Sequence, residues 1–359
     1  KMVSYWLARF NSIKSFFFIK KLLKIDMIRA KGTFYVEKEY LNNKIFSNEL
    51  NEQEYFKYSK YISIREGFLK HGIQIDTQDI ISEEDSDFTI YLDYPKNAQA
   101  HKKYLIVREP PIIIPKNHSL KYLKKFDKIF TYNDKLIDGK KIIKFINGSY
   151  DFSKIKIAKP KSQSGYVLIC RNKKSFRSGE CYSLRNRVIT FFESKNIKFH
   201  LYGFGWDLRA FNNNIIEVFF NRLPINRPKS RFIKNYKGTI NNKREKSSEY
   251  LFQFAIENSN NTEGYISEKI FDAFFSNNIP IYCGAPNIKN FIPEDCFISV
   301  NDFLSIEELI DFTTKLTKLD IETLKKSRDK FLSSSKANLF SADFNSKILI
   351  NEVINDIKI

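Results

Sequence analysis

The sequence predicts an α/β protein of two domains, each built on a largely parallel β-sheet. Its 359 residues are enough for two full hydrophobic cores. Strand-like and helical segments alternate along both halves, and the polar run at 159–165, which contains Pro and Gly, is typical of a linker. We therefore expect an N-terminal domain at 1–158, a second domain at 165–335, and a helical tail at 336–359 that packs back.

The first half contains six apolar runs of strand length. Several have no polar interruption, which is typical of parallel strands covered by helices on both faces. The runs are Thr33–Val36, Ile73–Ile75, Phe88–Tyr91, Tyr104–Val107, Lys128–Phe130 and Ile142–Phe145. The only G-x-G run in the chain, at 203–205, lacks a third glycine and a following helix signal, so it does not support a dinucleotide cofactor.

The second half alternates strands and helices in the same way. Its predicted strands are Tyr166–Cys170, Phe199–Tyr202, Gln253–Ile256 and Ile279–Cys283. Its predicted helices are Leu184–Phe192, Ile266–Asn278, Ile306–Leu316 and Ile321–Leu332, and the last stretch, Phe340–Ile359, is expected to add another.

The predicted helix at 266–278 places charged residues at its start. Apolar residues recur at i, i+4, i+7 and i+8 from Ile266, so Glu268 and Lys269 fall in the first helical turn. A helix N-terminus presents unpaired N–H groups and a partial positive charge, which suit an anion such as a diphosphate. Lys269 would add a full positive charge there.

Composition places the chain among folded proteins. Hydrophobic residues make up 42% and aromatic residues 15%, which excludes an intrinsically disordered chain. The net charge is +19, with Lys and Arg scattered among Asn and Ile along the whole length. A general compositional bias accounts for this charge as well as a functional basic face does. The basic segment at 226–246 lacks the framework of a nucleic-acid module, so we expect no nucleic-acid partner.

The cysteines and the N-terminal segment bear on location. Cys170, Cys181, Cys283 and Cys296 show no CxxC spacing, which argues against a structural zinc site or a disulfide framework and favours the cytoplasm. The apolar run at 15–19 is short and flanked by lysines, so it is too charged to span a bilayer. The segment at 14–25 is either a basic amphipathic helix in peripheral contact with the cytoplasmic membrane face or a first core helix.

A carboxylate follows one of the buried strands of the first half. Glu109 lies directly after the run Tyr104–Val107, at the carboxyl end where open α/β sheets place their active sites. Pro110 and Pro111 restrict the loop and make the backbone at Glu109 extended. The residues alone allow two interpretations, a proton-transfer group or a carboxylate paired with Arg108 or a nearby lysine.

An ordered set of motifs in the second half resembles a known family. The motifs are Glu257-Asn258, then Gly264-Tyr265-Ile266-Ser267-Glu268-Lys269, then Ile279-Pro280-Ile281-Tyr282-Cys283-Gly284-Ala285-Pro286, and then Phe291-Ile292-Pro293. Together they resemble the signature of the α1,3/α1,4-fucosyltransferases, glycosyltransferase family 10, in its bacterial type without an N-terminal membrane anchor. The chain departs from the pattern at Cys283, where many members carry Trp, and at Ser267, where many carry Thr.

The resemblance implies a fold and a reaction. The expected fold is GT-B, two Rossmann-like domains facing across a cleft, with the donor nucleotide held by the second domain. The expected reaction moves L-fucose from GDP-β-L-fucose to a hydroxyl of an acceptor oligosaccharide or glycolipid with inversion, for example α1,3 to the GlcNAc of a lactosamine-like or lipopolysaccharide glycan. Glu109-Pro110-Pro111 is similar to the family's Glu-small-Pro pattern, which implies that Glu109 is the general base.

The resemblance also implies which residues bind the donor. Arg185 and Lys269 would meet the diphosphate, Glu268 would accept hydrogen bonds from the ribose hydroxyls, and Asn258 and Tyr265 would position the nucleotide. The alternative for Arg185 is a surface ion pair with Glu180 or Glu193. A less specific element similar to the family's Tyr-x-Gly…Lys pattern adds the donor-site candidates Tyr236 and Lys243.

No metal is expected to be essential. Asp85-Ser86-Asp87 matches the D-x-D pattern that holds Mn²⁺ in many glycosyltransferases, but it precedes a strand, so it is expected to cap a loop. None of the four histidines has the spacing of a metal ligand, although His118 could lie near the Glu109 loop.

Two rival functions stay open at this point. The first is a transferase with the same diphosphate site that uses another GDP-sugar. The second is a non-catalytic basic protein of the same fold that binds a glycan or a polyanion.

Overall fold

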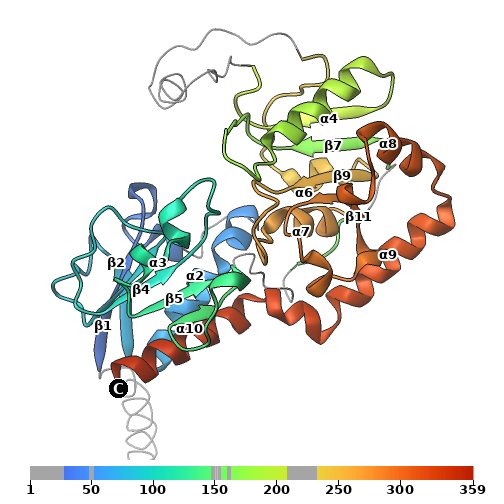
Figure 1. Ribbon diagram of the computed structural model, residues 1–359. Coiled ribbons are helices and arrows are strands. Elements are labelled where there is room, and N and C mark those ends of the chain that lie inside the picture. Colours follow the sequence, from blue (N-terminus) through green and yellow to red (C-terminus); the bar gives the residue numbers. More distant parts are fainter. Residues whose placement is uncertain are drawn as a thin grey trace, which may run out of the picture.

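The computed structural model describes residues 28–47, 52–146, 150, 152, 155–159, 163–207 and 233–358. At 52–57 it describes the backbone only. Two α/β domains lie side by side, and a C-terminal helix runs from the second back along the first (Figure 1). The segment at 14–25, with its two interpretations, lies outside the described residues.

The first domain is built on a six-stranded parallel sheet in the order β2-β1-β3-β4-β5-β6. Its strands are β1 Ala30–Tyr35, β2 Ile73–Thr77, β3 Phe88–Leu92, β4 Lys103–Ile106, β5 Lys128–Thr131 and β6 Ile142–Lys144. Its helices are α2 Glu52–Lys70 and α3 Leu120–Leu123, with 3₁₀ turns at Lys38–Tyr40, Lys44–Phe46, Pro115–His118 and Asp134–Leu136. Each of the six apolar runs predicted from the sequence is a strand, with shifted ends.

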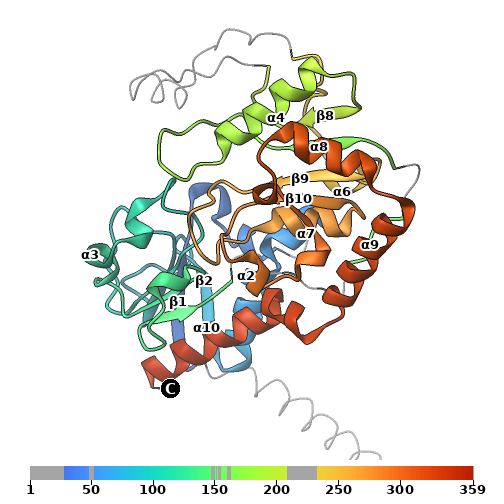
Figure 2. The same ribbon diagram turned by 45° about the vertical axis from the view of Figure 1, so that its right-hand side comes forward.

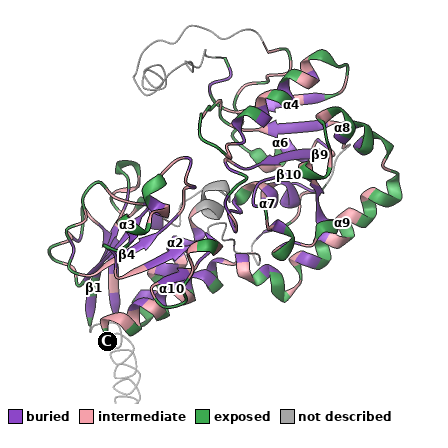
Figure 3. Ribbon diagram, in the orientation of Figure 1, coloured by how far each residue is buried: buried purple, intermediate pink, exposed green. Residues whose placement is uncertain are grey.

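The second domain is built on a five-stranded parallel sheet in the order β11-β10-β9-β7-β8 (Figure 2). Its strands are β7 Tyr166–Ile169, β8 Phe199–Tyr202, β9 Phe252–Ile256, β10 Ile279–Cys283 and β11 Ile298–Ser299. Its helices are α4 Tyr182–Ser194, α6 Lys243–Ser247, α7 Glu268–Phe275, α8 Ile306–Lys315 and α9 Lys318–Leu332, with 3₁₀ turns at Ile288–Asn290, Glu294–Cys296 and Val300–Asp302. Most strand residues are buried (Figure 3), as uninterrupted apolar runs require.

Helix α7 is shorter at both ends than the predicted Ile266–Asn278. Ser267 has an extended backbone and caps the helix, its side chain accepting a hydrogen bond from the Lys269 N–H. At the other end Asn277 takes a left-handed conformation with φ +62°, which stops the helix. Glu268 and Lys269 nevertheless occupy the first turn, as predicted.

The C-terminal helix α10, Ala342–Ile357, belongs in space to the first domain; it follows a 3₁₀ segment at Ser335–Phe340. Its residues Leu349 and Val353 are part of the same buried cluster as Phe68 of α2. Lys102 Nζ also forms an ion pair with Asp356 at 3.0 Å. The chain therefore passes between the domains twice.

The two passages between the domains are bonded to each other. The N–H of Tyr150, on the outward passage, donates to the carbonyl of Phe340 at 2.7 Å. The N–H of Ala342, on the return passage, donates to the carbonyl of Tyr150 at 2.8 Å. The crossing segments thus run in parallel as an isolated bridge between Tyr150 and Ser341.

The domains also touch through the loop that precedes α7. The ring of Tyr265 lies 5.1 Å from that of Tyr132 in the first domain. Asn287 Nδ2 donates to Asp134 at 2.8 Å, and the same Asn287 accepts from the N–H of Gly264 at 2.8 Å. A Cβ at Gly264 would lie 2.2 Å from the carbonyl oxygen of Tyr132, so this position tolerates no side chain.

Replacing Gly264 with Ala is expected to destabilise the protein more than the same change at Gly139. Both glycines have positive φ, +76° and +70°, but nothing lies within 4 Å of a Cβ at Gly139. Gly139→Ala should cost about 1 kcal/mol of unfolding free energy from backbone strain, whereas Gly264→Ala should cost a further 1–3 kcal/mol or so from the clash. Urea unfolding of the two variants measures the difference, and equal losses would contradict the close domain contact.

Candidate functional site

All predicted site residues except Tyr236 gather near the carboxyl ends of the two sheets. Glu109 follows β4 of the first domain, whereas Glu257 and Asn258 follow β9 of the second, beside the start of α7. This is the position at which open α/β sheets carry their ligands. Arg177 Nη1, from the second domain, donates to the carbonyl of Pro111 in the Glu109 loop at 3.0 Å, so the two sides of the site lie close together across the domain boundary. The positive charge of Lys269 also reaches the carboxyl of Glu109, where it opposes the rise in pKa.

The buried carboxylate of Glu257 organises the second-domain side. Glu257 is fully buried and accepts hydrogen bonds from the N–H of Ser267 at 2.7 Å, the hydroxyl of Ser267 at 2.6 Å and Lys269 Nζ at 3.0 Å. A buried carboxylate requires such partners, because losing its hydration is costly. Glu257 therefore holds both the start of α7 and the ammonium group of Lys269 in place. Sequence reasoning included Glu257 in the motif but assigned it no role.

Lys269 is held as a cation. Burial on its own would lower the pKa of its ammonium group, but the carboxylates of Glu257 and Glu268 outweigh burial and raise that pKa above its ordinary value. Its side chain keeps 20% of its surface exposed. Lys269 thus offers a positive charge at the helix N-terminus, where an anion is favoured.

Arg185 ties α4 to the end of β9. It is 3% exposed, and its Nη2 donates to the carbonyls of Ile256 and Glu257 at 2.7 and 2.8 Å and to Asn258 Oδ1 at 3.1 Å. Its Nε is buried and has no hydrogen-bond partner among the described residues.

The alternative interpretation of Arg185 as half of a surface ion pair is wrong. Glu180 instead accepts from the N–H of Ser183, and Glu193 accepts from the N–H groups of Lys234 and Asn235. The burial of Arg185 is stabilised because its guanidinium donates hydrogen bonds to backbone carbonyls at the end of a central strand, which the sheet leaves available.

Asn258 and Tyr265 continue the line of contacts from Arg185. Asn258 Nδ2 donates to the Tyr265 hydroxyl at 3.3 Å, while its Oδ1 accepts from Arg185. Burial, and then the charge of Glu257, raises the pKa of Tyr265 well above its ordinary value, so its hydroxyl stays neutral. Arg185, Asn258 and Tyr265 are therefore brought together, as the resemblance implied.

Glu268 and Lys243 form the outer edge of the site. Lys243 is the first residue of α6, after the cap residue Asn242, and α6 packs against α7. Burial would raise the pKa of Glu268, but the charges of Lys269 and Lys243 overcome it and lower that pKa to about 2. The Glu268 side chain, 55% exposed, is therefore an ionised acceptor open to a ligand's hydroxyl groups.

Tyr236 lies apart from the other donor-site candidates in its described contacts. Its hydroxyl donates to the carbonyl of Gly203 at 2.9 Å, and its backbone bridges to Leu201 of β8. Since β7 separates β8 from β9, these contacts place Tyr236 beside the edge strand.

On the first-domain side, Glu109 is held by its backbone. Its N–H donates to Asp93 Oδ1 at 3.0 Å, and its carbonyl accepts from His118 Nε2 at 2.9 Å, so His118 does lie at this loop. Arg108 forms ion pairs with Asp93 and Glu37 at 2.9 and 2.6 Å, and its positive charge also acts on the carboxyl of Glu109.

The environment of Glu109 suits a base. Burial first, and then the negative charge of Asp93, raise the pKa of the Glu109 carboxyl above its ordinary value. The positive charges of Arg108, Lys173 and Lys269 oppose this shift without cancelling it. A raised pKa makes the ionised carboxylate a stronger proton acceptor. Lys173, in the loop after β7, was not singled out from the sequence.

The remaining sequence candidates lie elsewhere or have structural roles. Asp85 accepts from the Ser82 hydroxyl at 2.7 Å and Asp87 from the N–H of Lys31 at 2.8 Å, so this D-x-D run caps loops before β3, as predicted. Across the described ranges, no cluster of three His, Cys, Asp or Glu side chains could hold a metal ion. Within the same ranges no helix is both long and apolar enough to cross a membrane.

Cys283 is a core residue. It is 2% exposed at the end of β10, and its sulfur lies 4.0 Å from that of Cys181, which caps α4. The departure at Cys283 from the Trp of the family pattern therefore changes the packing of the core beneath the site.

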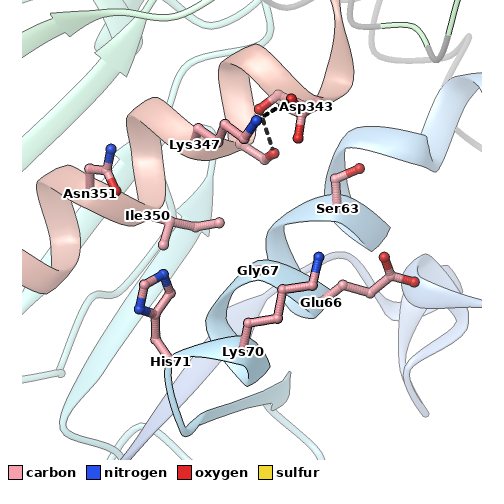
Figure 4. A pocket seen from close by; sticks show the side chains of 10 residues that line it. Ser63, Glu66, Gly67, Lys70, His71, Asp343, Lys347, Ile350 and Asn351 are labelled. Atoms are coloured by element: carbon pink, nitrogen blue, oxygen red, sulfur yellow. Dashed lines mark hydrogen bonds and ion pairs between the residues drawn. The ribbon is translucent and has the colours of Figure 1, made fainter.

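A groove of about 180 Å³ between α2 and α10 contains none of the predicted site residues (Figure 4). Its only described ion pair joins Lys347 to Asp343 at 2.6 Å, and His71 borders it before β2 begins. It thus lies toward the amino ends of the strands, away from Glu109 and Lys269.

The architecture defines a GT-B glycosyltransferase fold. A solved α1,3-fucosyltransferase with GDP is similar at a TM-score of 0.53 and 17% identity, over 92% of this chain and 90% of that one. A solved T4 phage BGT in complex with UDP and Mn²⁺ is similar at a TM-score of 0.51 and 13% identity, over 92% and 99%. At these identities the likeness concerns the fold, and it confirms the predicted fold class.

The family follows from sequence similarity. Residues 215–325 match the family model described as glycosyltransferase family 10 (fucosyltransferase) C-term. The α-(1,3)-fucosyltransferase FucT of Helicobacter pylori is 45% identical over 74 residues, and the α-(1,4)-fucosyltransferase of Arabidopsis thaliana is 41% identical over 69 residues. Residues 215–325 therefore carry the C-terminal domain of glycosyltransferase family 10, the family that the motifs predicted. The two alignments cover 20% and 19% of this chain and 15% and 17% of those relatives.

Proposed function

We propose that this protein transfers L-fucose from GDP-β-L-fucose to a hydroxyl group of an acceptor glycan, with inversion at the transferred carbon. One observation carries the proposal. Glu109 from one domain lies within electrostatic reach of the cation Lys269 from the other, and Arg185 and Asn258 meet at the strand end beside Lys269. The match of residues 215–325 to the fucosyltransferase family model supports fucose as the sugar, and the fold is shared with a solved α1,3-fucosyltransferase with GDP-fucose.

Inversion requires a single displacement. The ionised Glu109 carboxylate accepts the proton of the acceptor hydroxyl while that oxygen forms its bond to the fucose carbon. The bond to the diphosphate breaks on the opposite face, and GDP leaves with the electron pair. The raised pKa of Glu109 makes it able to hold the proton as the bond forms.

The second domain supplies the charge that the leaving group needs. Negative charge grows on the diphosphate as its bond breaks, and Lys269, together with the N-terminus of α7, lies where it could stabilise that charge. In this proposal Arg185, which is buried and whose Nε has no hydrogen-bond partner among the described residues, adds positive charge beneath the same ligand. Glu268 receives the ribose hydroxyls, and Asn258 and Tyr265 position the nucleotide. These cations take the role of a metal, so we propose that none is required.

The donor, the acceptor and the metal requirement are tested together. GDP-fucose and GDP-mannose are supplied with a panel that includes N-acetyllactosamine and lipopolysaccharide oligosaccharides, with and without EDTA. We expect an α-fucoside from GDP-fucose alone, insensitive to EDTA, with the linkage read by NMR as α1,3 to GlcNAc. Turnover of GDP-mannose instead would identify the rival transferase.

Calorimetry with GDP separates the enzyme from a binding protein. The proposal predicts GDP binding that depends weakly on salt. A polyanion-binding protein of the same fold would show no GDP affinity and a steep loss of heparin binding with salt. The four cysteines are free thiols, which fits our proposal that the enzyme acts in the cytoplasm at glycans or glycolipids presented there.

A further inference from the structure

We propose that Asp93 is a positioning residue for Glu109: it holds the backbone that carries Glu109 and strengthens Glu109 as a base. The inference rests on the proposed function, since it concerns the group that accepts the acceptor's proton. Asp93 follows β3, the strand next to β4 in the sheet, and sequence reasoning did not single it out.

The carboxylate of Asp93 collects four hydrogen bonds. Its Oδ1 accepts from the N–H of Arg108 at 2.7 Å, from the N–H of Glu109 at 3.0 Å and from Asn117 Nδ2 at 2.6 Å. Its Oδ2 accepts from Arg108 Nε at 2.9 Å. Asp93 is 3% exposed, so water does not substitute for these bonds. Two consecutive N–H groups of the Glu109 loop therefore depend on one buried side chain.

The backbone at Asp93 is strained in a way that serves this contact. Its φ is +61°, in the left-handed region that costs a non-glycine residue about 1–3 kcal/mol. The strand nevertheless continues its pairing, since the N–H of Asp93 donates to the carbonyl of Ile106 at 2.8 Å. The left-handed turn at the strand end brings the side chain beneath the neighbouring loop. Strain of this kind persists where the surroundings hold it, and such residues cluster at functional sites.

The charges around Glu109 define what Asp93 does to it. The charges of Asp93 and Arg108 from the first domain, and of Lys173 and Lys269 from the second, act on the carboxyl. The hydroxyls of Tyr132, Tyr182 and Tyr265 are within electrostatic reach, and His118 bonds the Glu109 carbonyl. Asp93 is the carboxylate in this set, so it is the group whose charge opposes ionisation of Glu109.

Asp93→Asn tests the proposal with little change of shape. Asn adopts positive φ more readily than most residues, and its Oδ1 can still accept from the two loop N–H groups. The negative charge beside Glu109 is lost, and Arg108 keeps its ion pair with Glu37 but loses the one with Asp93, so more of its positive charge acts on Glu109; both changes favour ionised Glu109. We therefore expect the pKa of Glu109 to fall, with the acid limb of kcat/KM moving to lower pH. The plateau rate should fall roughly 10- to 100-fold, because a weaker and less firmly placed base transfers the proton less well.

Arg108→Gln gives the opposite shift and protects the test against a folding defect. Removing the positive charge beside Glu109 should raise the pKa of Glu109 and move the acid limb to higher pH. A purely structural disturbance would not displace the limb in opposite directions in the two variants.

Asp76→Asn is the matched control. Asp76, in β2, is also a buried aspartate, 2% exposed, and it forms an ion pair with Arg65 at 2.5 Å. Strand β1 separates β2 from β3, the strand that Asp93 follows. The Asp76→Asn variant should lower the free energy of unfolding while leaving the pH profile of kcat/KM unchanged.

The deciding measurement does not depend on turnover. The carboxyl of Glu109 is titrated by NMR in ¹³C-glutamate-labelled protein, and its signal is assigned by its absence in Glu109→Gln. Opposite displacements in Asp93→Asn and Arg108→Gln support the inference, whereas an unmoved titration in Asp93→Asn overturns it. Fucosyl transfer by the wild-type chain is recorded separately, so its absence would refute the proposed function while the titration still decides the role of Asp93.

Discussion

Glu109→Gln is expected to lower the rate of fucosyl transfer by about 10²- to 10⁴-fold while GDP affinity changes little. The amide cannot accept the acceptor's proton, and the loss of a positioned general base has this size. The donor contacts come from the other domain and are untouched. Initial rates with GDP-fucose, together with calorimetry with GDP, measure the two properties on the same preparation.

The same variant should be more stable than wild type at neutral pH. The pKa of Glu109 is raised in the folded protein, so its contribution to stability is full below the unfolded-state pKa and is lost as pH rises through the folded-state pKa. Replacing the carboxyl removes that loss. A variant that is more stable than wild type but inactive would show that the ionised carboxyl of Glu109 lowers stability and is needed for transfer. Retained turnover would show that another residue is the base.

Lys269→Ala is expected to lower turnover by several orders of magnitude and to weaken GDP binding as well. Lys269 is the cation nearest the start of α7 in the proposed diphosphate site, and the loss of a charge-assisted contact to a leaving group raises the barrier directly. Single-turnover rates at saturating donor separate this effect from reduced affinity. Near-normal transfer would show that the diphosphate lies elsewhere.

A folding defect must be separated from this loss. Removing Lys269 leaves the fully buried carboxylate of Glu257 without its cation, which should destabilise the protein by about 3–5 kcal/mol. The double variant Lys269→Ala with Glu257→Gln removes the stranded charge. It should regain much of the stability in urea unfolding without regaining transfer, and recovery of both would mean that Lys269 is a structural residue.

Much of the fold could be predicted because both sheets are parallel and buried. Strands such as Phe88–Leu92 and Ile279–Cys283 are apolar along their whole length, and this pattern is independent of what surrounds them. The convergence of Glu109 and Lys269 follows from the same property, since the carboxyl ends of parallel strands share one edge.

Other features depend on contacts between distant segments and could not be predicted. Asp93 is followed by Tyr94 and Pro95 and has the pattern of an ordinary turn, and only the fold brings it beneath the loop that starts fifteen residues later at Arg108. Arg185 was expected at a helix start but its burial depends on the end of β9. The two-residue strand β11 carries too short a pattern to be recognised.

The paired crossings at Tyr150 and Ser341 limit how the enzyme can open. Two chain segments that are hydrogen-bonded to each other restrict the relative movement of the domains more than a single linker would. If the domains separate to admit the nucleotide and release GDP, these two segments are the place where the movement is most restricted.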